Sequence, residues 1–356
     1  MTQNPSSRGG RAVPAMHGRD QPAIMPGTSQ LPDHFHAQDD DYVIPFAVEP
    51  LDVRGRVIRL GPLLDTMLDR HDYPEPVSRL LAEMVVFTLL LGTALKFDGR
   101  FIVQAQGDGP VSLLVVDFTT PDGVRAMARY DSERLDAMIE QGIRTSAQLM
   151  GKGHLALTVD QGPHMQRYQG VVAMQGESLE EMAQAYFLQS EQIPTRVRLS
   201  VAQSIEAGDH GRARWRAGGL LAQYLPRDAS ELPARDLHPG DHPEGAEAVH
   251  EPVAQPDRWR EAEAMVATIE SDELVDPQLG SDRLLFRLFH ERGVRVFEGS
   301  EVVGRCSCSP DRVQATVKTF GDEPDASMLV DGAIEVTCEF CSRRYRFDPD
   351  SYEQVS

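Results

Sequence analysis

The sequence predicts an α+β protein with a mixed, hairpin-rich N-terminal domain, a helical linker and a small C-terminal domain. Short β-prone runs separated by turn residues fill positions 42–225, without the regular strand and helix alternation of a doubly wound fold. A proline-rich, acidic stretch follows, and all four cysteines lie beyond it in two tight pairs. Because 356 residues exceed the usual size of one domain, more than one folded unit is expected.

Residues 1–41 are rich in Pro, Gly and Asp. Such a composition buries too little apolar surface to fold, so we expect a disordered extension. The segment also lacks the continuous apolar stretch of a secretory signal, which favours a cytoplasmic protein. The longest apolar run of the chain, residues 84–92, is far shorter than the ~20 residues that span a bilayer, so no membrane partner is expected.

Residues 42–225 are expected to form the mixed α/β main domain. The run at 76–95 begins with a proline and is apolar on nearly every face, which predicts a helix in the centre of the core. Ser178 and Glu181 form a capping-box pattern that predicts the start of a second helix. Hairpin turns at 108–110 and 120–123 predict an antiparallel meander. The expected strands are 43–53, 100–107, 111–118, 123–130, 154–161, 167–174, 195–205 and 211–225.

Two kinds of linker are expected after this domain. Residues 226–256 hold many prolines and acidic residues and few large apolar side chains, which predicts a flexible acidic linker. Residues 257–299 predict a helical linker region with two amphipathic helices, whose apolar stripe normally packs into a core. Six large side chains of this region, called the linker stripe below, are Trp259, Val266, Ile269, Leu285, Leu288 and Phe289.

The cysteines are spaced C-x-C, 29 residues, C-x-x-C, at Cys306, Cys308, Cys338 and Cys341. Four such thiolates can hold one Zn²⁺ tetrahedrally, so residues 300–356 are expected to form a small C-terminal zinc-binding domain. The C-x-C half is unusual for a structural zinc ribbon, and its sulfurs can also form a strained disulfide that is easily reduced. An iron–sulfur cluster also takes four cysteines, but C-x-C is not a common ferredoxin spacing.

The charge balance argues against nucleic acid as a partner. The net charge is −20, and acidic residues outnumber basic ones in the predicted C-terminal domain too, where only 343–346 forms a basic cluster. No catalytic group is predicted, because Ser190 and Glu191 lack a histidine at a telling spacing and fit the end of a helix. The chain is therefore not expected to be an enzyme.

Several separated motifs together resemble one family. The segments "RYQGVV" (167–172), "YFLQSEQIPT" (186–195) and "RAGGLLAQYLP" (216–226) occur in order before the two cysteine pairs. Over about residues 42–356 the chain thus resembles the 33 kDa heat-shock protein family, the cytosolic redox-regulated holdases also called 33 kDa chaperonins. The N-terminal extension and the proline-rich linker are departures from the family pattern, but neither removes a cysteine.

The resemblance implies an ATP-independent chaperone that binds unfolding proteins under oxidative stress. It implies that the four cysteines hold one Zn²⁺ in the reduced, inactive form, and that oxidation joins Cys306 to Cys308 and Cys338 to Cys341. Zinc would then leave and the linker stripe would become accessible to client proteins. A homodimer of the oxidised form is a further expectation. The alternative is a constitutive structural zinc-ribbon interaction protein, which would keep its metal when oxidised.

Overall fold

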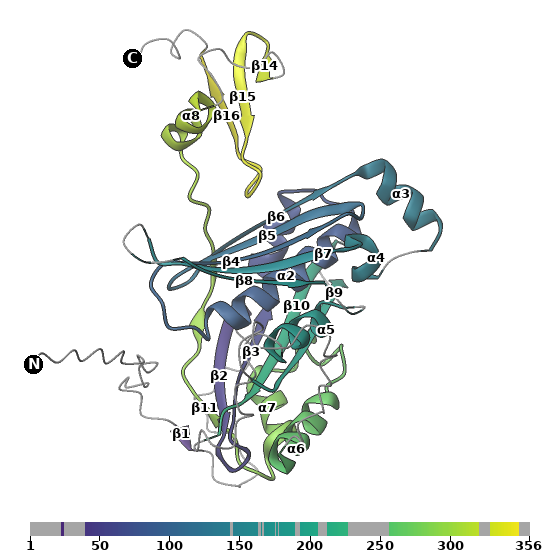
Figure 1. Ribbon diagram of the computed structural model, residues 1–356, viewed down its shortest axis with the longest axis vertical. Helices are drawn as coiled ribbons and strands as arrows, with labels where there is room; N and C mark the ends of the chain where they lie inside the picture. Colours follow the sequence, from purple (N-terminus) through teal and green to yellow (C-terminus); the bar gives the residue numbers. More distant parts are fainter. Residues whose placement is uncertain are drawn as a thin grey trace, which may run out of the picture.

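The computed structural model describes residues 23–24, 40–142, 145–162, 165, 167–174, 176, 178–188, 193–205, 212–226, 256–319 and 328–348. Two β-sheets with a helix between them form the main body, and two further helices cover the outer face of one sheet (Figure 1). A small C-terminal unit with its own sheet stands above this body. The predicted α+β fold class is confirmed.

The first sheet, sheet A, has seven strands, and all its pairs are antiparallel. Three of these strands are only two residues long, and they come from outside the predicted main domain. The order is β1 (Ala23–Ile24), β11 (Arg295–Val296), β2 (Tyr42–Val48), β3 (Val53–Leu60), β10 (Ala213–Tyr224) and β9 (Thr195–Ile205), and β12 (Ser300–Glu301) also pairs with β2.

The second sheet, sheet B, contains the predicted meander as β4, β5 and β6. Its order is β13 (Val303–Gly304), β6 (Gly123–Tyr130), β5 (Val111–Thr119), β4 (Arg100–Gly107), β7 (Gly153–Asp160) and β8 (Tyr168–Ala173). The pair β13–β6 is parallel, unlike its neighbours. The chain therefore leaves sheet A at β12 and joins the edge of sheet B at β13.

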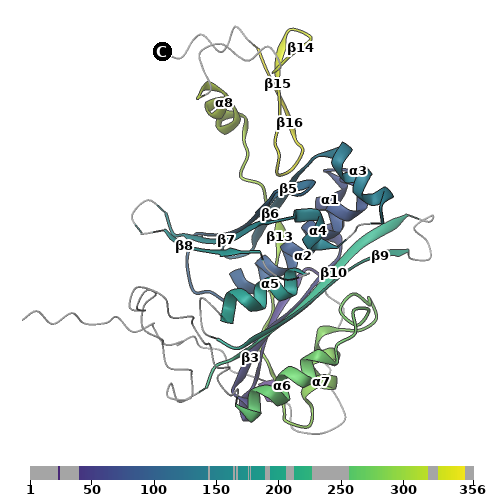
Figure 2. The same ribbon diagram turned by 45° about the vertical axis from the view of Figure 1, so that its right-hand side comes forward.

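Helix α2 (Glu75–Gly92) lies between the two sheets and contacts strands of both (Figure 2). It matches the predicted central helix, and its residues from Met84 to Gly92 are all buried. Helix α5 (Leu179–Tyr186) begins at the predicted cap, where the Ser178 hydroxyl accepts a hydrogen bond from the backbone N–H of Glu181. Within the main domain, four short helical elements were not predicted: η1 (Glu49–Leu51), α1 (Pro62–Asp69), α3 (Ser132–Glu140) and α4 (Ser146–Met150).

Sheet A is buried on both faces, because neighbouring residues of its central strands point into different cores. On β3, Val57 faces one core and Ile58 the other, and on β10 the same holds for Leu220 and Leu221. The inner core surrounds α2. The outer core lies under α6 (Asp257–Ala267) and α7 (Ser281–Phe289), the two predicted linker helices.

The C-terminal unit consists of α8 (Pro310–Lys318), β14 (Leu329–Val330), β15 (Ala333–Thr337) and β16 (Arg344–Phe347). Its small apolar core has two buried side chains, Val317 and Ile334, and four partly buried ones pack against them: Val313, Met328, Val336 and Phe347. Strands β12 and β13 belong to the predicted domain 300–356, yet they pair with sheets A and B. The separate unit thus begins after Gly304.

Most of the predicted extension 1–41 and of the predicted linker 226–256 lies outside the described residues. Within the extension, β1 pairs with β11, and the Asp40 carboxylate forms an ion pair with Arg216 at 2.6 Å. Among the described segments, no helix combines the length and the apolar character that crossing a membrane requires.

Glu83 is a half-buried carboxyl group on the central helix. Burial raises its pKa to about 7, although a hydrogen bond from Ser146 and the charge of Arg79 lower the pKa and Glu180 raises it further. The folded state thus favours the protonated form of Glu83. Stability from this group is fully present below the unfolded pKa of 4.5 and is lost as the pH rises through about 7.

Replacing Glu83 by Gln should therefore change the stability relative to the parent more favourably at pH 8 than at pH 5. We expect the difference in unfolding free energy between the two pH values to change by about 2 kcal/mol, measured by urea denaturation. Glu140→Gln, which removes an exposed carboxylate at the end of α3, is the control for the lost charge. Equal pH slopes for the two variants would contradict the assignment.

Candidate metal centre

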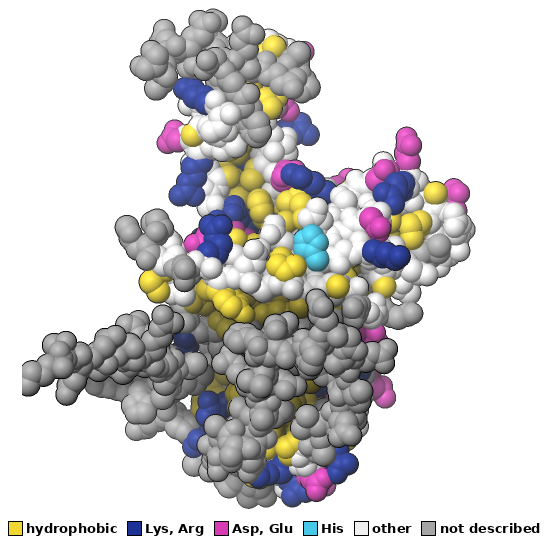
Figure 3. All heavy atoms as spheres, viewed as in Figure 1, with side chains coloured by type: hydrophobic (Ala, Val, Ile, Leu, Met, Phe, Trp, Pro, Cys, Tyr) yellow, Lys and Arg dark blue, Asp and Glu magenta, His cyan; other side chains and the backbone are white. Residues whose placement is uncertain are grey.

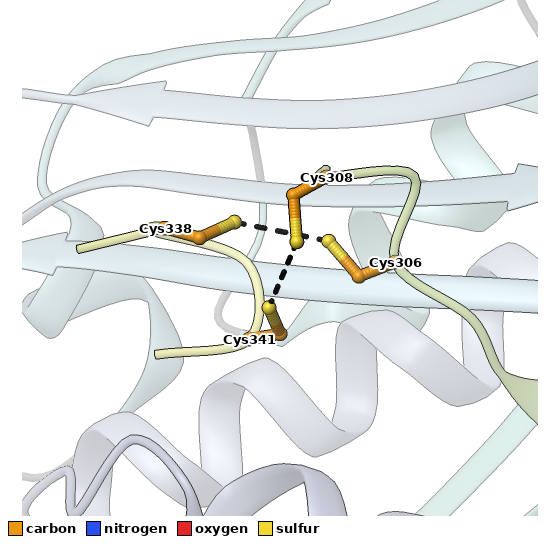
Figure 4. A group of neighbouring side chains, drawn as sticks. All are labelled: Cys306, Cys308, Cys338 and Cys341. Atoms are coloured by element: carbon orange, nitrogen blue, oxygen red, sulfur yellow. Dashed lines mark hydrogen bonds between the residues drawn. The ribbon is translucent and has the colours of Figure 1, made fainter. Parts of the chain in front are cut away.

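The four cysteines form one cluster, called the cysteine cluster below (Figure 4). Their Sγ atoms all lie within 4.8 Å of one another, and every thiol is free. The Sγ atoms of Cys306 and Cys338 are 3.7 Å apart, and those of Cys308 and Cys341 are 3.4 Å apart. Around a tetrahedral ion with metal–sulfur bonds near 2.3 Å, sulfur atoms lie about 3.8 Å apart. The spacing of the cluster therefore fits a four-thiolate metal site.

Local structure brings each pair into place. Cys306 lies two residues after β13, and Cys308 lies two residues before α8, whose first turn is capped by the Ser309 hydroxyl accepting from the N–H of Arg312. The other pair lies in the turn between β15 and β16, residues 338–342, which we call the knuckle. There the N–H groups of Cys341 and Ser342 both donate to the carbonyl of Cys338. The two pairs thus come from different segments and meet face to face.

A tyrosine contacts the cluster directly. The Tyr345 hydroxyl on β16 donates a hydrogen bond to the Sγ of Cys308, 3.0 Å away. Burial raises the pKa of Cys308, but hydrogen bonds from Tyr345 and the other thiols outweigh it and lower the pKa to about 7. Burial raises the pKa of Cys338 and Cys341, the latter to about 12. A bound cation favours the thiolate form of every ligand, so metal binding would release protons from this cluster.

The knuckle rests on the main body. Arg129 on β6 forms two 2.9 Å hydrogen bonds with the Glu339 carboxylate. His71, just after α1, donates from Nε2 to the carbonyl of Phe340 at 3.2 Å, and its Nδ1 accepts from the Ser342 hydroxyl at 3.1 Å. Burial lowers the pKa of His71, which favours the neutral ring, with Nε2 as the donor and Nδ1 as the acceptor.

A cavity of about 260 Å³ lies beside these contacts, between α1, β6, β13 and the knuckle. Two of the four cysteines, Cys306 and Cys341, line it together with Arg70, Arg125 and Arg305. In the space-filling view, apolar side chains gather at the neck between the C-terminal unit and sheet B, with basic side chains close by (Figure 3). The cluster is therefore half-buried against the main body.

The comparison with known proteins agrees with the motifs. A family model described as Hsp33 protein matches residues 41–348. This chain belongs to the Hsp33 family. Proteins named 33 kDa chaperonin from Caulobacter vibrioides and Pseudomonas putida are 45% and 37% identical to it over 313 and 320 residues. Those alignments cover 87% and 89% of this chain, and 95% and 94% of the two relatives.

The crystal structure of the 33 kDa chaperonin of Thermotoga maritima shares the fold. The TM-score is 0.65 at 18% sequence identity, and the match covers 88% of this chain and 97% of that chain. The family resemblance that the sequence motifs indicated is therefore confirmed.

The linker stripe of this Hsp33 protein is completely buried. Its six side chains are between 0% and 7% exposed and pack on the outer face of sheet A. The ring of Trp259 lies 6.4 Å from that of Tyr224 on β10, and the ring of Phe289 stacks on that of Phe46 on β2 at 5.7 Å. The predicted site residues thus lie in two separate groups, the cysteine cluster next to sheet B and the linker stripe on the outer face of sheet A.

Three residues of this site were missed in the sequence. Tyr345 lies in a short basic run, while His71 and Arg125 lie far from the cysteines in the chain. An alternation of apolar and polar residues marks Arg125 as a strand residue and says nothing of what it contacts. Only the tertiary arrangement brings these side chains to the cluster.

Replacing Tyr345 by Phe should weaken metal binding while leaving all four ligands in place. Loss of a hydrogen bond to a ligand atom typically lowers metal affinity at least tenfold, and we expect roughly that loss for Zn²⁺. Chelator competition on the reduced protein measures it. The control is Tyr42→Phe on β2, which removes a tyrosine hydroxyl from sheet A. Equal zinc affinities of the two variants would rule out a role for the Tyr345 hydroxyl.

Proposed function

We propose that this chain is a redox-regulated, ATP-independent holdase that is inactive when reduced and zinc-bound. The observation that carries the proposal is the burial of the linker stripe against sheet A, in the segment that leads directly into the cysteine cluster. A holdase requires apolar surface that is covered in one state and offered in another. The chain supplies such a surface and a redox-sensitive group next to it.

The loop between α6 and α7 docks at a defined place on sheet A, which we call the seat. Arg198 and Arg216 donate hydrogen bonds of 2.9 and 3.0 Å to the backbone carbonyls of Ile269 and Val275, between α6 and α7. Gly218 on β10 faces the same loop, and a Cβ at this position would lie 2.0 Å from the carbonyl oxygen of Leu274. The seat therefore depends on close backbone approach, and docking can be disturbed without touching a cysteine.

The route from seat to cluster is short. After α7 the chain pairs with β2 through β11 and β12, then with β6 through β13, and reaches Cys306 two residues later. Because the C-terminal unit has a very small apolar core, its fold should depend on metal binding, worth roughly 10–16 kcal/mol in structural zinc sites. Disorder of this unit would then reach the linker through three two-residue pairs.

The four cysteines would hold Zn²⁺, which crosslinks the two halves of the unit. Oxidation by hydrogen peroxide joins two thiols in one disulfide, as two electrons and the two thiol protons pass to the peroxide and two water molecules form. Two such steps, at Cys306–Cys308 and Cys338–Cys341, consume all four ligand thiols. The cysteines can then no longer bind zinc, the unit unfolds, and α6 and α7 come off sheet A.

Undocking would expose two apolar surfaces, the linker stripe and the outer face of sheet A. Unfolded or partly unfolded proteins are the proposed clients, because they offer apolar segments of no fixed shape. The same exposed surfaces would support a homodimer of the oxidised form. The net charge of −20 disfavours nucleic acid as a partner, and a cytoplasmic location suits a thiol switch that must start reduced.

The central experiment compares the reduced and the peroxide-treated protein in suppressing aggregation of a thermally unfolding client. We expect protection only after oxidation, together with loss of one zinc ion and four free thiols, all reversed by dithiothreitol. The variant with all four cysteines replaced by Ser should protect the client without peroxide. Protection by that variant only after peroxide, or oxidation with the metal retained, would sink the proposal and favour a constitutive zinc ribbon.

Replacing Gly218 by Ala should undock the linker while the cluster stays intact, because the added methyl group overlaps the backbone of Leu274. We expect the reduced, zinc-loaded variant to protect the client at least several-fold better than the reduced parent. Gly304→Ala is the matched control, since a Cβ there meets no atom within 4 Å. If Gly218→Ala stays inactive until oxidised although its linker is cleaved faster by protease, the linker surface is not where clients bind.

A further inference from the structure

Arg125 on β6 is held firmly by the main body. Its Nε and Nη2 atoms donate to the same carboxylate oxygen of Asp117, at 3.0 and 2.7 Å. Asp117 on β5 is only 3% exposed, and the Arg125 side chain is 17% exposed. The position of this guanidinium is therefore set within sheet B.

The same guanidinium also contacts residues that lie between the cysteines. Nη1 donates to the Ser307 hydroxyl at 2.9 Å, and the guanidinium carbon lies 4.2 Å from the centre of the Phe340 ring. Ser307 is the residue between Cys306 and Cys308, and Phe340 lies between Cys338 and Cys341. One side chain of the main body thus contacts the spacer of both cysteine pairs.

Three other polar contacts between the C-terminal region and the main body each involve one side only. Arg129 and His71 contact the knuckle, whereas Arg305, which forms a 3.0 Å ion pair with Asp122, belongs to the segment before Cys306. Arg125 is therefore distinct in joining both halves to one point of sheet B.

Electrostatics favours the same arrangement. Four thiolates around a divalent cation carry a net charge of −2, and a half-buried guanidinium beside them offsets part of it. Burial lowers the pKa of Arg125, but the hydrogen bonds and charges of Asp117 and Cys306 outweigh it and raise the pKa. Arg125 thus stays cationic beside the cluster.

We propose that Arg125 is the positioning residue that couples the cysteine cluster to the linker, by holding both spacers on sheet B at once. The coupling runs through the adjacent backbone, because β13 pairs with Gly123 and Val124, directly before Arg125. Disruption of either cysteine pair removes one of its two partners in the unit and frees the β13 edge. Docking of α6 and α7 then requires both halves to be in place. This inference rests on the proposed function.

The test uses the full-length, reduced, zinc-loaded protein. Arg125→Gln should retain one zinc ion and four free thiols, yet amide hydrogen exchange in α6, α7 and β11 should become at least tenfold faster. Client protection without peroxide should appear together with that change. Arg129→Gln is the matched control, because it removes an arginine of the same strand whose ion pair is exposed, and it should change linker exchange less than twofold.

Phe340→Leu provides a second variant, since it removes the stacked ring and leaves the Arg125–Asp117 pair untouched. It should also accelerate linker exchange, and the double variant should add little to Arg125→Gln alone. Linker exchange that stays at the parent value in Phe340→Leu, or equal effects of Arg125→Gln and Arg129→Gln, would overturn the coupling.

The exchange measurement also separates this inference from the proposed function. If the linker of Arg125→Gln opens but no client is protected, the coupling stands and the holdase proposal fails. If the oxidised parent protects the client while the linker of Arg125→Gln stays closed, only the coupling fails.

Discussion

Four thiolates within 4.8 Å of one another repel unless a cation lies between them, and the C-terminal unit has little else to hold it together. Val317 and Ile334, with four partly buried side chains against them, form a small core for a unit of this size, so we expect a bound metal to supply much of its stability. Under the proposed function, the order of this unit therefore depends on its thiol chemistry. By the same proposal, the segment between α7 and α8 shares this dependence, because its strands are two residues long and the last of them ends two residues before Cys306.

The main body needs no such support. Helix α2 is surrounded by two sheets, and its core is complete without the C-terminal unit. Only the outer face of sheet A is incomplete, because its apolar side chains are covered by helices that the linker supplies. The molecule thus combines a domain that has its own core with two helices that cover one face of it, and under the proposed function the docking of these helices is controlled from the far side of the domain.

Local sequence signals were enough for the central helix, the meander, the cap at Ser178 and the two linker helices, since each depends on residues close together in the chain. The cysteine spacing likewise indicated a metal site without any knowledge of the fold. By contrast, the seat at Gly218 and the contact of Arg125 with both spacers join residues far apart in sequence. Helix α8 could not be predicted as readily, because it is short and has only one buried side chain, Val317, on an otherwise polar surface.

The succession of β13, β12 and β11 also has a mechanical meaning. Each pair spans only two residues, and the three are loaded in sequence when the chain is drawn away from its C-terminal side. Such a segment can separate one strand pair at a time, so each step breaks a few hydrogen bonds and no long ladder has to break at once. A small force or a modest loss of order at the cysteine end is then sufficient to start separation, and the process can stop or reverse at any of the three pairs.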